Sequence, residues 1–184
     1  MLELGAKMMQ SSKRGVFLNP LSMLLAGLIL GVAARLFDIY FQILGEIFSQ
    51  MAIWIPFGTL IAVYSPTKKA AMGNIFPFCM GMLAAYYVTA AITHGVYGRS
   101  FIIGWTVFAL VSPVLAYFAW MTKKRGVFPK IIAAGIVAVS VMSSILLFDH
   151  LRIYDVIIDG VLIYILFFKK KDADKRKQGE QSDF

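Results

Sequence analysis

Residues 21–37 of the chain read LSMLLAGLILGVAARLF, an apolar run whose only charged residue, Arg35, lies close to its end. A helix needs roughly 17–25 apolar residues to cross the hydrocarbon core of a bilayer, so this run is long enough to span it. Within hydrocarbon an open backbone would leave its donors and acceptors unpaired, and a helical backbone is therefore required. The run predicts the first of several transmembrane helices.

Five further apolar stretches follow along the chain, at Ile47–Tyr64, Ala71–Thr93, Phe101–Met121, Ile131–Phe148 and Leu151–Phe168. The composition agrees with membrane residence, because 59% of the residues are hydrophobic and 15% are charged, whereas soluble domains carry about 25% charged residues. Together with Leu21–Phe37, these stretches predict an all-α fold, a polytopic integral membrane protein built as a six-transmembrane-helix bundle.

The lysines and arginines are sorted onto alternate gaps between the stretches. Of 18 basic residues, 15 precede the first stretch, follow the last one or lie in the gaps at 65–70 and 122–130, which leaves Arg35, Arg99 and Arg152. Positive charge near short loops marks the cytoplasmic side of a membrane protein. Both termini are therefore expected to be cytoplasmic, and the expected location is the cell membrane, as a multi-pass protein of the bacterial plasma membrane.

This topology divides the chain into three parts. Residues 1–20 form a cytoplasmic segment, residues 21–168 form the membrane domain, and residues 169–184 are a basic polar tail that is expected to be disordered. Within the membrane domain, residues 38–50 contain no Lys or Arg and are too apolar for a solvated loop. They predict an outer-face interfacial helix or a re-entrant lid; the alternative is that the first or second helix runs longer and tilts.

Two glycines give the first helix a small face. Gly27 and Gly31 are four residues apart, so they lie above one another on one side of the helix, where small residues allow close approach of a second backbone. The face serves either packing within the chain or docking of a membrane partner subunit. The lipid bilayer is the other expected partner. Nucleic acid is not expected, because the net charge of +8 comes from span ends and the tail, where topology and anionic lipid explain it.

Ionisable residues within or beside the spans point to function, because each is costly unless it meets water or a partner. With the expected topology they gather on the outer half of the bundle, at Arg35, Asp38, Glu46, His94, Arg99, Asp149, His150, Arg152, Asp155 and Asp159. Asp155 and Asp159 are four residues apart and share one face of the last helix, so Asp159 is expected to point into the bundle. Arg35 is their expected counter-ion if the first and last helices are neighbours. The charges are then a structural pair, a site for a polar solute, or part of a proton- or cation-coupled pathway.

Enzyme classes find little support in the sequence. The two acids of an intramembrane aspartic dyad would come from facing helices, whereas Asp155 and Asp159 share one helix. The chain has no Gly-x-Ser-x-Gly nucleophile elbow and no phosphate-binding glycine loop, and His94 and His150 do not have the spacing of a helical metal site. We therefore expect a non-enzymatic protein without a cofactor or a bound metal.

Residues 54–73 read WIPFGTLIAVYSPTKKAAMG, a proline-containing helix that ends in a basic loop followed by small residues. Together with six spans, cytoplasmic termini, a small-residue first helix and an apolar outer segment, this stretch resembles the substrate-binding S-components of energy-coupling-factor vitamin transporters. A span that ends in the pair Tyr86-Tyr87 is also similar to small bacterial six-span membrane proteins.

The resemblance to S-components implies binding of a small polar solute from the outer side and docking of the Gly27/Gly31 face on an energising membrane partner. The candidate ligand-binding residues are then Arg35, Asp38, Tyr86, Tyr87, Trp105, Asp155 and Asp159. The competing hypothesis is a non-catalytic interaction or regulatory membrane subunit, in which the same charges lock the helices together.

Overall fold

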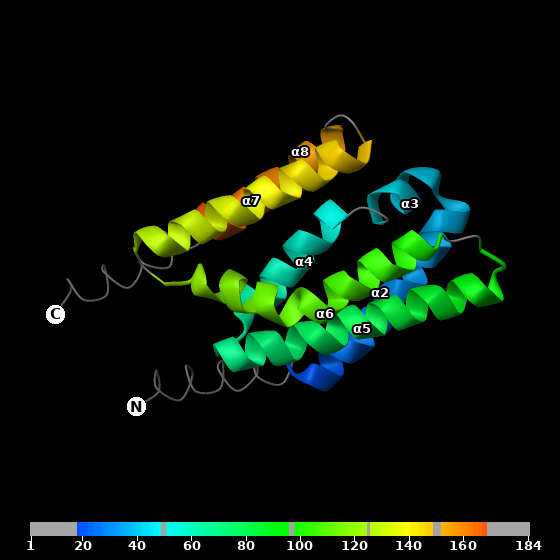
Figure 1. The fold of residues 1–184 in the computed structure, drawn as a ribbon, viewed down its shortest axis with the longest axis horizontal. Helices are drawn as coiled ribbons and strands as arrows, with labels where there is room; N and C mark the ends of the chain where they lie inside the picture. Colours follow the sequence, from blue (N-terminus) through cyan, green and yellow to red (C-terminus); the bar gives the residue numbers. More distant parts are fainter. Residues whose placement is uncertain (1–17, 49–50, 96–97, 125, 149–151, 169–184) are drawn as a thin grey trace, which may run out of the picture.

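The computed structural model describes residues 18–48, 51–95, 98–124, 126–148 and 152–168. Its helices are α2 (Pro20–Tyr40), α3 (Gln42–Phe48), α4 (Met51–Tyr64), α5 (Lys68–Ile92), α6 (Arg99–Met121), α7 (Val127–Phe148) and α8 (Ile153–Ile163), which continues into the short π-helix η1 (Tyr164–Phe168) (Figure 1). No strand occurs in these ranges, so the expected all-α fold is confirmed. Residues 1–17 and the expected tail at 169–184 lie outside the described residues.

Four helices are long and apolar enough to cross a membrane. They are α2, α5, α6 and the first 19 residues of α7, Val127–Ile145. The predicted stretch at 47–64 contains the shorter helix α4, whose 14 residues rise about 21 Å, less than the hydrocarbon thickness of about 30 Å. The predicted stretch at 151–168 contains the 11-residue helix α8 followed by η1.

Helices α2 and α5 pack closely along most of α2. A Cβ atom at Gly27 would overlap the carbonyl oxygen of Phe78, and one at Gly31 would overlap that of Met82. Gly81 of α5 packs equally closely on α2, because a Cβ atom there would lie 2.8 Å from the carbonyl oxygen of Leu24. The Gly27/Gly31 face is therefore occupied within the chain, which is the first of the two alternatives that the sequence left open.

The segment after α2 forms a separate helix. Helix α2 continues three residues beyond Phe37 to Tyr40, and Phe41 then takes an extended conformation with φ of −137°. Helix α3 folds back on the end of α2, where a Cβ atom at Gly45 would lie 2.6 Å from Asp38 Cα. The separate helix and the longer first helix, which the sequence poses as alternatives, are thus both present.

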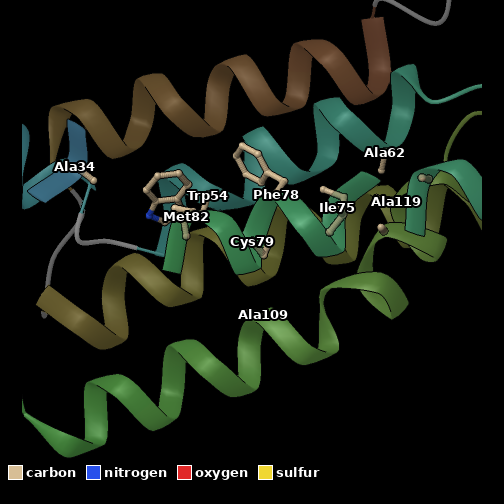
Figure 2. Packing of buried hydrophobic residues seen from close by; sticks show 11 residues of the cluster. Ala34, Trp54, Ala62, Ile75, Phe78, Cys79, Met82, Ala109 and Ala119 are labelled. Atoms are coloured by element: carbon tan, nitrogen blue, oxygen red, sulfur yellow. The ribbon is translucent and has the colours of Figure 1, made fainter. Parts of the chain in front are cut away.

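Helix α4 connects the two halves of the bundle. Figure 1 shows α2, α5 and α6 on one side of α4 and the pair α7 and α8 on the other, and α4 packs against α5, α6, α7 and α8. The main core surrounds α5, with Ile75, Phe78 and Met82 buried beside Trp54 of α4 (Figure 2). A second core holds Ala133 of α7 against Leu162 and Leu166 of the last helix.

Hydrogen bonds join three helices at the end of the bundle where α4 meets α5. The carbonyl oxygen of Ser65 accepts from Trp120 Nε1 at 3.1 Å and from Lys123 Nζ at 2.9 Å. Asn74 Nδ2 donates to Ser65 Oγ at 3.2 Å and to the carbonyl oxygen of Leu18 at 3.0 Å. Burial lowers the pKa of the Lys123 ammonium. We call this the inner end of the bundle, following the expected topology, and the opposite end the outer end.

Candidate functional site

A cluster of polar side chains joins α2 and α5 at the outer end. Arg35 and Asp38 form an ion pair within α2, with NH1 2.5 Å from Oδ2. Arg35 Nε donates to Thr93 Oγ1 at 3.2 Å, and the Tyr86 hydroxyl donates to Asp38 Oδ2 at 3.3 Å. The side chain of Arg35 is 13% exposed and that of Asp38 is 36% exposed, so the carboxylate remains accessible from outside. We call these four residues the Arg35 cluster.

An outer cavity of about 240 Å³ lies beside this cluster. Its walls are mostly aromatic, from Phe48, Trp54, Tyr86, Tyr87, Phe101 and Trp105. Helix α3 contributes Phe48, whose ring centre is 5.7 Å from that of Trp54 and whose carbonyl oxygen accepts from Trp54 Nε1 at 2.8 Å. Residues from α2 to α6 therefore meet around one small volume.

Tyr86 belongs to both the Arg35 cluster and the outer cavity. Its ring lines the cavity while its hydroxyl group reaches Asp38, and the ring of Tyr87 packs edge-on against it at 5.5 Å. Trp105 of α6 lines the same cavity. Of the predicted ligand-binding set, Tyr86, Tyr87 and Trp105 therefore line the cavity. Arg35 and Asp38 do not line it and are linked to it through the hydroxyl group of Tyr86.

Asp155 and Asp159 lie elsewhere, on α8, which packs against α4 and α7. Both carboxylates point into the bundle as expected, with 0% and 6% exposure. Asp155 Oδ2 accepts from the backbone N–H of Arg152 at 3.0 Å. Asp159 is within interaction range of the Ser140 hydroxyl on α7, yet Asp155 Oδ1, Asp159 Oδ1 and Ser140 Oγ complete no hydrogen bond within the described part of the chain.

The expectation that Arg35 is the counter-ion of these acids is wrong. Arg35 is held between Asp38 and Thr93, while α8 lies beside α7 on the far side of α4 (Figure 1). The basic residue next to Asp155 is Arg152, the N-cap residue of α8. Its guanidinium donates to Glu46 Oε2 of α3 at 2.9 Å and to the Tyr154 hydroxyl. The first and last helices are not packed as neighbours, so the charges expected to form one site are divided between two.

Four residues named above in the outer site were not assigned to it from the sequence, namely Phe48, Trp54, Thr93 and Phe101. Phe48 and Trp54 flank the short break between α3 and α4, and their aromatic character was the available signal. Thr93 gave no signal, because an isolated threonine at a helix end is ordinary. Two predicted outer residues, Asp149 and His150, lie outside the described residues. Arg99 and His94 are exposed and do not line the cavity.

The described residues contain no group of three or more His, Cys, Asp or Glu side chains that could hold a metal ion. The arrangement can instead offer a cation, an anion and aromatic surfaces to a small molecule. Comparisons with known protein families, with curated proteins and with solved structures find no match for this chain.

Proposed function

We propose that this membrane protein binds a small polar or zwitterionic solute in the outer cavity, as a substrate-binding subunit of a transporter. The observation that carries the proposal is the position of Tyr86. One side of this residue forms a cavity wall and the other side holds the Arg35–Asp38 ion pair. Ligand sites typically combine aromatic walls with a few orienting polar groups.

The charges of the site suit a zwitterion. The Asp38 carboxylate, whose side chain is 36% exposed, can accept hydrogen bonds from an ammonium group, and the positive charge of Arg35 attracts a carboxylate. The faces of Trp105 and Tyr87 attract a cation that enters the cavity. The volume of 240 Å³ is below the range of about 300–1,000 Å³ for sites that hold drug-sized ligands, which favours a small solute.

The proposal includes a topology of six spans with both termini in the cytoplasm. Fifteen of the 18 basic residues then face the cytoplasm, as the positive-inside rule requires. Helix α4 and the continuous segment of α8 and η1 would complete the two further crossings. The outer cavity then opens to the side from which a solute arrives, and α3 forms its outer wall through Phe48.

Thermal-shift screening of the purified protein in detergent tests the proposal. Vitamins, amino acids and their relatives are the compounds to screen, since a ligand at 100 times its dissociation constant stabilises a protein by about 2.7 kcal/mol. The shift should disappear in Asp38→Asn, because Asp38 contacts the cavity-lining residue Tyr86. It should persist in the control Arg99→Gln, because Arg99 is exposed at the start of α6 and does not belong to the Arg35 cluster. A broad screen without any shift, or a shift retained by Asp38→Asn, contradicts the solute site.

The second candidate function is that of an interaction or regulatory subunit, and α8 supports it. The Arg152–Glu46 pair joins α8 to α3, and neither residue lines the outer cavity, as expected for charges that hold helices together. Because the Gly27/Gly31 face is occupied by α5, a partner would dock elsewhere, for example on the exposed side of α2 around Leu25 and Ile29. Pull-down of one defined membrane partner by the wild type, lost on Ile29→Lys, together with a blank solute screen, would favour this function.

A further inference from the structure

A second and larger cavity of about 430 Å³ lies deeper in the bundle, between α4, α5, α6 and α7. Its lining is apolar apart from a few groups such as Thr59 and Ser112. We call it the central cavity. Its volume is within the range of about 300–1,000 Å³ that ligand sites occupy, and its walls offer almost nothing to a polar molecule.

The central cavity is open at the side of the bundle, between α6 and α7. Leu115 of α6 and Val139 of α7 line it, and both remain substantially exposed, at 45% and 56%. At the depth of these helices the surrounding medium is lipid, so the molecules that reach this opening are hydrocarbon chains.

The inner end of the cavity adjoins a cluster of positive charge. Ala119 and Ile132 line the cavity there. Lys123 and Lys124 follow one helical turn after Ala119, and Lys130 is two residues before Ile132. Lys123 donates to the carbonyl oxygen of Ser65, and Lys124 Nζ lies 5.9 Å from the centre of the Trp120 ring. All three lysines are exposed.

We propose that the central cavity is a binding site for one anionic phospholipid. An acyl chain enters between α6 and α7 and fills the apolar cavity, and the phosphate group meets Lys124 and Lys130 at the inner end. Charge complementarity selects this occupant, because basic clusters between transmembrane helices attract anionic headgroups while the apolar lining accepts only the chain. Trp54 and Met82 separate this site from the outer cavity, so the proposal stands independently of solute binding.

Gly135 allows the cavity to be filled without a clash. It lines the central cavity, and a Cβ atom built on it meets no atom within 4 Å. Gly135→Leu should therefore fold and place its side chain where the acyl chain lies. Gly160→Leu is the matched control, since a Cβ atom there also meets nothing within 4 Å and Gly160 does not line the cavity.

Native mass spectrometry of the purified full chain measures the binding, with phosphatidylglycerol and phosphatidylcholine of identical acyl chains as probes. The wild type and Gly160→Leu should retain one phosphatidylglycerol, and Gly135→Leu should bind it at least tenfold more weakly. Lys124→Gln combined with Lys130→Gln should abolish the preference for phosphatidylglycerol over phosphatidylcholine, whereas Lys69→Gln should keep it.

Two results would overturn the proposal. Equal retention of the two lipids by the wild type, unchanged in Gly135→Leu, would mean that lipid binds only as a general annulus. Unchanged lipid binding together with a change of oligomeric state in Gly135→Leu, but not in Gly160→Leu, would mean that a helix of a second subunit occupies the cavity.

Discussion

Trp54 on α4 and Met82 on α5 line both the outer cavity and the central cavity. Both side chains are almost fully buried, at 5% and 7% exposure, and they lie side by side in Figure 2. They form the partition between a small aromatic cavity beside the Arg35 cluster and a larger apolar cavity. The indole of Trp54 is fixed by its hydrogen bond to the carbonyl oxygen of Phe48, so α3 helps to hold this partition in place.

Removing the partition should be costly. Trp54→Ala joins the two cavities and should lower the free energy of unfolding by about 3–5 kcal/mol, as large-to-small core changes do. Trp54→Phe keeps most of the ring volume and loses the Nε1 hydrogen bond, at a cost of about 1 kcal/mol. Denaturant titration in detergent measures both values. Similar losses for the two variants would show that the ring does not separate the cavities.

The Arg35 cluster should contribute to stability through its own helix and α5. Arg35→Ala removes the bonds to Asp38 and Thr93 and should cost about 1.5–3 kcal/mol, the range for charge-assisted hydrogen bonds. Arg99 is exposed at the start of α6, so Arg99→Ala should change stability by less than about 0.5 kcal/mol. The melting temperatures of Arg35→Ala and Arg99→Ala in detergent compare the two losses of stability. A double-mutant cycle of Arg35→Ala with Asp38→Ala should show coupling, and additive effects would contradict the ion pair.

The helices themselves could be predicted because hydrophobicity is a local property of the sequence. The stretches predicted at 21–37, 71–93, 101–121 and 131–148 correspond to α2, α5, α6 and α7. The stretch predicted at 47–64 extends across two elements, since α3 ends at Phe48 and α4 begins at Met51. Ser49 and Gln50 at the break are polar, but a pair of residues is too short to stand out in a hydropathy window of about 19 residues.

The candidate site could be predicted only in part, because helix neighbours depend on contacts between distant residues. Tyr86, Tyr87 and Trp105 were named as candidate ligand-binding residues, and the three line one cavity. Arg35 was assigned to Asp155 and Asp159 on the assumption that the first and last helices touch. In the structure the partner of Arg35 is Asp38, three residues later on the same helix. Such a local ion pair neutralises Arg35 without any acid from a distant helix.

The contact between α2 and α5 should depend on the absence of a Cβ atom. Gly31→Ala would push a methyl group into the carbonyl oxygen of Met82, and overpacking of this kind costs about 1–3 kcal/mol. Gly73→Ala on α5 is the control, since a Cβ atom there meets nothing within 4 Å and should stabilise the helix by about 0.5–1 kcal/mol. In thermal unfolding in detergent, Gly31→Ala should lower the melting temperature and Gly73→Ala should raise it. A shift of both melting temperatures in the same direction would contradict the close packing of α2 on α5.

The two acids of α8 should respond differently to neutralisation. Asp159→Asn replaces a carboxylate oxygen that meets no donor among the described residues with an amide that can also donate to Ser140 Oγ, which should raise the free energy of unfolding by about 1–3 kcal/mol. Asp155→Asn removes a negative charge from the first turn of α8 and should lower it by about 0.3–1 kcal/mol. Chemical unfolding of both variants measures whether each substitution raises or lowers the free energy of unfolding. Destabilisation by Asp159→Asn would show that its charge is compensated in the folded protein.

Side-specific labelling tests the proposed topology. Gly98 precedes α6 and Lys124 follows it, so single cysteines at these positions should react with an impermeant maleimide from opposite sides of the membrane, Gly98→Cys from outside and Lys124→Cys from the cytoplasm. In the loop after α6, Lys124 is a better position for the cysteine than Gly126, because Gly126 has a φ of 135° at which a cysteine would be strained. A Cys79→Ala background removes the buried native thiol. Labelling of both cysteines from one side would show that α6 does not cross the membrane.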